Sequence, residues 1–229
     1  MKAMILAAGR GERMRPLTDT VPKPLLEAGG KPLIVWHIER LARAGVRELV
    51  INHAHLGAQI EHALGTGSRY GVTIAYSPEG QALETAGGIA QALPLLGTDP
   101  FLVVNGDIHT DVDFGALVRV ALGGAPPALA HLVLVDNPAH NPDGDFAFDG
   151  PYATDTGMPR YTFSGVGIYR PDLFAGIVPG TRAKLAPLLI AAMRERRVTA
   201  ERHRGYWLDV GTPARLAELD RHLRMPPIV

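Results

Sequence analysis

The sequence contains no cysteine, which excludes disulfide bonds, thiolate metal sites and a cysteine nucleophile. It also lacks an excess of either charge, because 23 Lys and Arg residues balance 23 Asp and Glu residues. No overall field would therefore attract nucleic acid or a membrane, and a phosphate ligand must be held by local groups. The N-terminal apolar run ends at Gly9, too short for a signal peptide or a membrane span. These absences predict a cytoplasmic protein whose partners are neither nucleic acids nor membranes.

Strands and helices alternate through the first half of the chain, which at 229 residues is long enough to bury a substantial core. Short apolar runs predict strands over residues 2–7, 47–52, 72–77 and 100–107. Apolar residues at helical spacing predict helices over residues 32–44, 55–67 and 84–93. This alternation predicts an α/β fold with a Rossmann-like, mostly parallel central sheet and helices on both faces.

The pattern changes after Asp113. Strands are predicted over residues 131–138 and 161–170, and the segment between them is rich in Pro, Gly and Asp, as expected of hairpin turns and a small lid. A helix over 184–196, a strand with a turn over 205–212 and an amphipathic helix over 213–224 follow. No fixed-period repeat is present, so we expect one domain over residues 1–229 without a β-helix extension.

A glycine turn follows the first predicted strand in the stretch "LAAGRGERMRPLTDTVPKPLLE". It fits neither common phosphate-loop pattern, because Gly9 and Gly11 lack the third glycine of a dinucleotide fold and no G-x-x-x-x-G-K-[ST] follows. The stretch offers backbone N–H groups, the cations Arg13 and Arg15, and Lys23 between two prolines that restrict its backbone. Several fixed donors suit several phosphate oxygens, which favours a nucleoside triphosphate over a solvated basic loop.

The same stretch resembles the signature of the sugar-1-phosphate nucleotidyltransferases, roughly L-A-[AG]-G-x-G-[ST]-R-[LM]-x-P-L-T-x-x-x-P-K-P-[LM]. The match is long and gapless, and "NGD" and then "GYWLDVGTPARL" follow in the order of that family. The resemblance covers nearly the whole chain. It implies transfer of a nucleotidyl group to a sugar 1-phosphate, with a nucleotide-binding half over about 1–113 and a sugar-binding half with the closing helix over about 114–229.

The resemblance implies that the glycine stretch wraps the nucleotide, with Arg13 and Lys23 on its phosphates. The residues implied in nucleotide binding along this stretch are Ala7, Ala8, Gly9, Gly11, Glu12, Arg13 and Lys23. The residues implied in catalysis are Arg13, Lys23, Asp107 and Asp209.

Asp107 and Asp209 are also implied to hold a divalent metal, Mg²⁺. An anionic sugar phosphate that attacks an anionic triphosphate needs its charge neutralised, and Mg²⁺ takes one or two carboxylates together with phosphate oxygens and waters. Each aspartate ends a predicted strand, where α/β sheets place their ligands. Either aspartate alone is more simply the cap of a turn, so it is the pair that favours a metal site.

Recognition of the base is implied for the stretch "SPEGQALETAG". Glu79 falls at the position that reads the base edge, Gly80 lets the chain approach closely, and a backbone contact falls near Glu84. An ionised carboxylate accepts but does not donate hydrogen bonds, which favours uracil, thymine or guanine over cytosine. Gln81 remains an alternative reader because its amide both donates and accepts.

On the sugar side, Asn105 lies beside the expected metal site and could reach a hydroxyl or N-acetyl group. The other residues implied there are Asp145, Phe146, Ser164 and Gly165. Many relatives carry a lysine in "E-K-P" that neutralises the sugar phosphate, but here no lysine occurs between Lys31 and Lys184. Lys184 or Arg204 could supply that charge.

Chain length and the stretches "VNGDIHTDVDF" and "YSPEGQALETAGGI" most resemble family members of cell-wall sugar recycling. The resemblance therefore implies UTP and N-acetylmuramate 1-phosphate as substrates. The alternatives are guanylyl transfer to mannose 1-phosphate, uridylyl or thymidylyl transfer to glucose 1-phosphate, and a non-catalytic regulatory paralogue.

Histidines are assigned no catalytic role, since His53 and His55 lack a third metal ligand and His37 falls on an apolar helix face. Leucines of the closing helix, Leu216, Leu219 and Leu223, could pack internally or against a second copy. A monomer and a homodimer are both compatible with this pattern.

Overall fold

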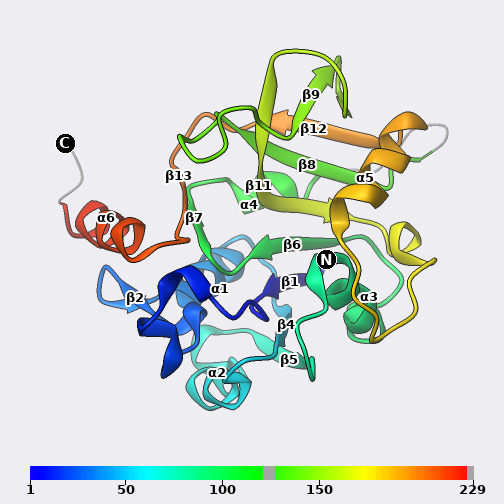
Figure 1. Cartoon of the computed structure of the whole chain (residues 1–229). Coiled ribbons are helices and arrows are strands. Elements are labelled where there is room, and N and C mark those ends of the chain that lie inside the picture. The colour runs from blue at the N-terminus through cyan, green and yellow to red at the C-terminus, as the bar shows by residue number, and fades with distance from the viewer. Residues whose placement is uncertain (121–126, 226–229) are drawn as a thin grey trace.

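The computed structural model describes residues 1–120 and 127–225, and its centre is a nine-stranded sheet (Figure 1). In spatial order the strands are β5 (Thr73–Pro78), β4 (Glu48–His53), β1 (Ala3–Leu6), β6 (Phe101–Asn105), β11 (Arg160–Tyr169), β8 (Ala130–Val135), β12 (Val198–Arg202), β10 (Tyr152–Thr154) and β9 (Phe146–Asp149). Two short antiparallel ribbons accompany it, made by β2 (Glu27–Ala28) with β3 (Lys31–Pro32) and by β7 (Ile108–Thr110) with β13 (Trp207–Asp209).

Strand direction divides the sheet into two halves. β1 lies between β4 and β6 and runs parallel to both, and β5 runs parallel to β4, so this half confirms the predicted parallel arrangement. β11 runs antiparallel to both β6 and β8, while β12 runs parallel to β8. The second half of the sheet therefore mixes parallel and antiparallel strands. This arrangement arises because strands after Asp113 are joined partly by hairpins rather than by crossover helices.

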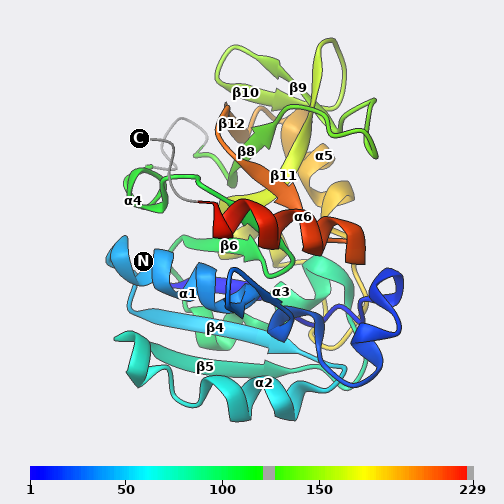
Figure 2. The same ribbon diagram turned by 90° about the vertical axis from the view of Figure 1, so that its left-hand side faces the viewer.

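Helices cover both faces of the sheet, as the strand–helix alternation predicts (Figure 2). They are α1 (Leu33–Arg43), α2 (Gly57–Leu64), α3 (Glu84–Leu96), α4 (Phe114–Leu117), α5 (Leu185–Arg194) and α6 (Pro213–Arg224). The alternating side chains of β1 show the two cores: Ile5 belongs to the apolar cluster that includes side chains of α1 and α2, whereas Met4 belongs to the cluster that includes side chains of α3 and α5. Met4 and Ile5 are both fully buried.

The closing helix α6 lies at the edge of the molecule and packs one face against the β2–β3 ribbon (Figure 1). Leu219 is fully buried, and Leu216 and Leu223 pack against the same apolar cluster. The carboxylate of Asp220 also accepts the Gly29 N–H at 2.8 Å. These leucines therefore stabilise the fold of this chain rather than leaving an apolar stripe exposed.

Two parts of the second half are more ordered than the sequence predicts. The segment expected to form hairpin turns and a lid holds β9 and β10, which extend the edge of the main sheet. β12 has no counterpart in the sequence prediction, because its short run "VTAER" lacks an apolar pattern. Among the described helices, none combines the length and the apolar character needed to cross a membrane.

Candidate active site

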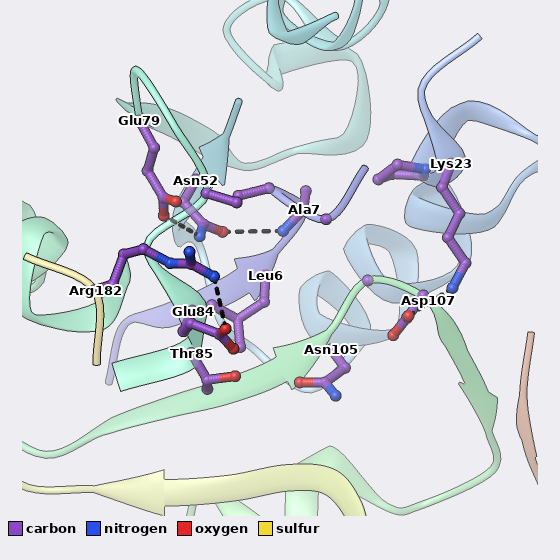
Figure 3. Close-up of a pocket in the computed structure, with 15 residues that line it drawn as sticks. Leu6, Ala7, Lys23, Asn52, Glu79, Glu84, Thr85, Asn105, Asp107 and Arg182 are labelled. Atoms are coloured by element: carbon purple, nitrogen blue, oxygen red, sulfur yellow. Dashed lines mark hydrogen bonds and ion pairs between the residues drawn. The ribbon is translucent and has the colours of Figure 1, made fainter. Parts of the chain in front are cut away.

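A cavity of about 340 Å³ lies at the carboxyl ends of β1, β4 and β6, where parallel α/β sheets place their ligands (Figure 3). Its walls come from the loop after β1, the turn after β6 and the segment that leads from β5 into α3. Lys23 closes one side, and Arg182, which precedes α5, reaches in from the other.

The predicted phosphate loop lines this cavity with Ala7, Ala8 and Gly9. Gly11 has a left-handed backbone with φ of 69°, and a Cβ there would lie 2.9 Å from the Thr18 Cγ2 atom. Thr18 holds the turn by donating its hydroxyl to the Gly11 carbonyl at 2.8 Å. Glycine is therefore required for the loop to fold against the following segment.

Lys23 is the buried cation of the site. It begins a short 3-10 turn, Lys23–Leu25, that directly follows the extended residue Pro22. Its side chain is 8% exposed, and its ammonium nitrogen lies 2.6 Å from the Asp107 Oδ2 atom. Two residues that the sequence assigned to one reaction, far apart in the chain, are thus in direct contact (Figure 3).

The backbones of Asp107 and Asp209 lie next to each other at one end of the β7–β13 ribbon, and their shared metal site stays a prediction. Asp209 pairs in register with Ile108, and the Val210 N–H donates to the Asp107 carbonyl at 2.9 Å. The Asp209 carboxylate accepts from Arg215 at 2.9 Å, and His140 lies 3.3 Å away. Each aspartate therefore has a cation or an imidazole beside it.

These two carboxylates fit a Mg²⁺ ion, which needs only one or two protein carboxylates because phosphate oxygens and waters complete its shell. In the part of the chain that the structure describes, no cluster of three or more His, Cys, Asp or Glu side chains offers a closed metal cage. Asp107 lines the cavity beside the phosphate loop, whereas Asp209 lies outside the described lining and bonds Arg215, so a metal shared by the two stays a prediction.

Four residues predicted around the nucleotide lie outside the described lining of the cavity: Gly11, Glu12, Arg13 and Gly80. Arg13 faces the turn after β13, since a Cβ on Gly211 would lie 2.9 Å from its Nη2 atom. Glu12 is exposed and lies 3.3 Å from Arg10. Gly80 is exposed, and a Cβ there would meet nothing within 4 Å. Their roles in binding stay predictions.

A buried polar network joins the ends of β1, β4 and β5 (Figure 3). The Asn52 amide accepts the Ala7 N–H at 2.9 Å and donates to the Glu79 Oε1 atom at 2.6 Å. The other Glu79 oxygen accepts the Leu83 N–H at 2.8 Å, and Glu79 is 4% exposed. Gly88 makes room for the network, because a Cβ there would lie 2.5 Å from the Glu79 Oε1 atom.

Sequence reasoning missed Asn52 and Arg182 as lining residues of the cavity. Asn52 was given no role, although a polar residue at the end of a strand beside β1 was an available signal. Arg182 carries no local signal, because its partner Glu84 lies 98 residues earlier.

Asn105 and Gly165, both predicted on the sugar side, are in contact. Asn105 lines the cavity, and a Cβ on Gly165 would lie 2.6 Å from its Nδ2 atom. Gly165 has a φ of 81° and sits where the register of β11 against β8 shifts. The neighbouring Ser164 turns inward and donates its hydroxyl to the Val133 carbonyl at 2.7 Å.

The remaining residues predicted on the sugar side lie outside the described lining. The Asp145 carboxylate accepts the Phe163 N–H at 2.7 Å, and Phe146 is buried in β9. Lys184 and Arg204 are both exposed. Which of them meets a sugar phosphate stays a prediction.

The three histidines named in the sequence analysis have partners within the protein. His37 is buried, and its Nε2–H donates to the Ile108 carbonyl at 2.8 Å. Burial lowers the pKa of His37 to about 4, so its ring is neutral near pH 7. His53 lies 2.7 Å from the Glu61 carboxylate, and His55 lies 3.1 Å from the Thr18 carbonyl.

Comparison with known proteins defines the class of the molecule. The family described as "Nucleotidyl transferase" matches residues 2–144. Over 222 residues the chain is 64% identical to the N-acetylmuramate alpha-1-phosphate uridylyltransferase of Neisseria meningitidis serogroup B, covering 95% of this chain and 96% of that protein. It is 31% identical to a mannose-1-phosphate guanyltransferase of Schizosaccharomyces pombe, covering 93% of this chain and 61% of that one.

Solved structures share the fold. A putative glucose-1-phosphate thymidylyltransferase from Bacillus anthracis has a TM-score of 0.85 at 22% identity, covering 100% of this chain and 97% of that one. HddC from Yersinia pseudotuberculosis, complexed with GMP-PN, has a TM-score of 0.78 at 18% identity, and the match covers 97% of this chain and 99% of that one.

The chain therefore belongs to the nucleotidyl transferase family. The predictions of an α/β nucleotidyltransferase fold and of a sugar-1-phosphate nucleotidyltransferase are confirmed. Among the relatives described above, the chain is most similar to the Neisseria protein.

Proposed function

We propose that this protein transfers the uridylyl group of UTP to N-acetylmuramate 1-phosphate, producing a UDP-sugar and pyrophosphate. The observation that carries the proposal is the 64% identity to the Neisseria enzyme over nearly the full length of both chains. The cavity at the carboxyl ends of β1, β4 and β6 supports it, because it combines the phosphate loop with Lys23 and Asp107.

In the proposed reaction, an oxygen of the sugar phosphate attacks the α-phosphorus of UTP. A P–O bond forms there as the bond to the β-phosphate bridging oxygen breaks, and pyrophosphate leaves. No general base is required, because the attacking phosphate oxygen is already ionised near pH 7. Catalysis then rests on alignment of the two substrates and on stabilisation of the charge that moves onto pyrophosphate.

Different residues of the cavity would bind the phosphates, the metal and the sugar. The loop residues Ala8 and Gly9 line the cavity, where their backbone N–H groups would donate to phosphate oxygens, and Lys23 supplies a nearly buried positive charge. Asp107 and Asp209 would hold Mg²⁺, which neutralises phosphate charge when bound. Asn105 orients the sugar beside the turn after β6.

We also propose that the reaction takes place in the cytoplasm, as a step of cell-wall sugar recycling, with the protein acting as a monomer or a homodimer. The cysteine-free composition is compatible with a reducing compartment.

The test is a pyrophosphate-release assay with Mg²⁺ that crosses UTP, dTTP, GTP and CTP with a panel of sugar 1-phosphates. The panel includes N-acetylmuramate, glucose, N-acetylglucosamine and mannose 1-phosphates. We expect the highest kcat/KM for UTP with N-acetylmuramate 1-phosphate. Preference for GTP with mannose 1-phosphate, or for glucose 1-phosphate, would replace this assignment with one of the alternatives.

A further inference from the structure

Two arginines from opposite ends of the chain converge on the turn that follows β13. A Cβ on Gly211, which lies in this turn, would be 2.5 Å from the Arg215 Nη2 atom and 2.9 Å from the Arg13 Nη2 atom. Both guanidinium groups therefore face one buried stretch of backbone, and glycine leaves the space that they occupy. The carboxylate of Asp209 lies at the same place, because its Oδ1 atom would be 3.1 Å from that Cβ.

Apolar packing brings the two arginines together. Arg13 lies in a short 3-10 turn of the signature stretch, and Arg215 lies in the first turn of α6. Met14, the neighbour of Arg13, is fully buried in one apolar cluster with Val210 and Leu219. The beginning of α6 lies beside the blue N-terminal segment in both views of the molecule (Figures 1 and 2). The fold thus sets the position of Arg215 relative to the phosphate loop.

Positive charge exceeds negative charge at this corner. The Arg215 Nη1 atom donates to the Asp209 Oδ2 atom at 2.9 Å and lies 3.0 Å from the His140 Nδ1 atom. Within residues 1–120 and 127–225, no hydrogen bond or ion pair joins the Arg13 side chain to another group. Asp209 therefore neutralises only one of the two guanidinium charges. Like charges repel each other, so an anion that binds between the two arginines stabilises the arrangement.

The position of this corner indicates which anion it takes. Ala8 and Gly9 of the phosphate loop line the cavity, and Arg13 follows them along the chain, outside the described lining. A triphosphate that binds the loop with its α-phosphate near Lys23 would extend its last two phosphates toward Arg13. Arg13 is exposed, whereas the Arg215 side chain is 15% exposed, so a ligand that reaches the first meets the second behind it.

We propose that Arg215 is a catalytic residue that binds the pyrophosphate end of the nucleoside triphosphate together with Arg13. This role rests on the proposed nucleotidyl transfer, but not on the identity of the sugar. When the bond between the α-phosphorus and the bridging oxygen breaks, the electron pair stays on that oxygen and leaves with pyrophosphate. The Arg215 Nη2–H groups donate to pyrophosphate oxygens and stabilise this charge without transferring a proton.

The bond between Arg215 and Asp209 separates this role from mere positioning of an expected metal ligand. If Arg215 only holds Asp209 for a metal, its effect on pyrophosphate binding requires Mg²⁺. If Arg215 binds pyrophosphate directly, the effect persists without a metal, and the Asp209 carboxylate competes with the anion for one guanidinium. Removal of that carboxylate should then leave metal-free binding as tight as before or make it tighter.

The test is calorimetric binding of pyrophosphate to the full chain with a chelator and without nucleotide or sugar. The variants are Arg215→Gln, Arg215→Lys and Asp209→Asn, and thermal unfolding checks their fold. Glutamine can still donate to Asp209 but carries no charge, whereas lysine keeps the charge but lacks the fork that bonds two partners at once. Arg224→Gln is the matched control, because this exposed arginine of the same helix bonds Asp220.

We expect the wild type and the control to bind pyrophosphate equally, and Arg215→Gln to bind it about tenfold more weakly, with Arg215→Lys between them. Asp209→Asn should bind it at least as tightly as the wild type. An unchanged Kd in folded Arg215→Gln would overturn the proposal, as would weaker binding by Asp209→Asn or no binding by the wild type. If Arg215→Gln does not fold, the other two variants decide.

This experiment also keeps the proposal apart from the proposed function. If pyrophosphate binding behaves as expected but UTP and N-acetylmuramate 1-phosphate give no product, the substrate assignment fails and the pyrophosphate site stands. If the product forms but Arg215→Gln binds pyrophosphate like the wild type, the substrate assignment stands and the role of Arg215 fails.

Discussion

The ammonium nitrogen of Lys23 lies 2.6 Å from the carboxylate of Asp107, a residue 84 positions later in the chain. This contact joins the signature loop to the turn after β6, so that a nearly buried cation and an expected metal ligand share one corner of the cavity. Charge-assisted hydrogen bonds of this kind are short and directional. The pair therefore holds both groups in place before substrate binds.

Lys23→Gln and Asp107→Asn are each expected to lower kcat by about 100-fold or more, because each removes a charge that acts on the transferring phosphate. The fold-decrease in kcat of the double variant should be smaller than the product of the two single fold-decreases, because the two residues act as a unit. Steady-state pyrophosphate release measures the turnover, and thermal unfolding checks the fold. Wild-type turnover in either folded variant would contradict the assignment.

Asp209→Asn is expected to raise the Mg²⁺ concentration needed for half-maximal activity, because one of two proposed carboxylate ligands loses its charge. Removal of divalent ions with a chelator should abolish pyrophosphate release, and added Mg²⁺ should restore it. The control is Asp220→Asn, which changes a carboxylate of α6 that bonds Gly29 and Arg224. Identical Mg²⁺ curves for Asp209→Asn and the wild type would remove Asp209 from the metal site.

Gly88→Ala should disturb the buried network behind the phosphate loop. Its new methyl group would lie 2.5 Å from the Glu79 Oε1 atom and 2.8 Å from the Asn52 Nδ2 atom. Overpacking of this kind costs about 1–3 kcal/mol of folding free energy. Because Asn52 also holds the Ala7 N–H, we expect a raised KM for UTP.

A double-variant cycle identifies the source of that cost. In a Glu79→Ala background the closest obstructing atoms are gone, so Gly88→Ala should cost less there than in the wild type. Urea unfolding of the four proteins measures the difference. Equal costs in both backgrounds would show that the methyl group clashes with something other than the Glu79 side chain.

His37 should make the fold less stable in mild acid. Burial lowers its pKa to about 4 in the folded protein, whereas an unfolded histidine titrates near 6.5. Between these values the unfolded state binds the proton and the folded state does not. Stability from this group is therefore complete above about pH 6.5 and falls as the pH drops toward 4, by at most about 1.4 kcal/mol per pH unit.

The His37→Gln variant tests this sign, because glutamine can still donate to the Ile108 carbonyl but does not titrate. Urea unfolding at pH 7 and pH 5 gives the loss of stability for each protein. The wild type should lose about 1–2 kcal/mol more than the variant over this interval. Equal losses would mean that His37 does not titrate as its burial predicts.

Local patterns predict the parts of the site that depend on a single strand and its turn. The loop at Gly9 and the turn at Asp107 each follow an apolar run, so their place at one sheet edge follows from the topology of parallel strands. Asp209 was predicted as a metal ligand from the family resemblance alone, and the β7–β13 ribbon brings its backbone next to that of Asp107.

The parts that escaped prediction depend on contacts between segments far apart in the chain. Arg182 reaches Glu84 only because the segment before α5 is anchored on α3. Glu79 was expected to face a base, but Asn52 and the Leu83 N–H occupy both of its oxygens, and its role stays a prediction. A pattern along the sequence gives the residue type but not the hydrogen-bond partners that tertiary packing brings.

The most direct test of the proposed function is the identity of the product. The purified protein is incubated with UTP, Mg²⁺ and N-acetylmuramate 1-phosphate, and the mixture is analysed by mass spectrometry together with a pyrophosphate assay. The account predicts UDP-N-acetylmuramate and pyrophosphate in equal amounts, with the Lys23→Gln protein forming neither at a comparable rate. Absence of this nucleotide sugar, while the same protein forms another from a different sugar 1-phosphate, would contradict it.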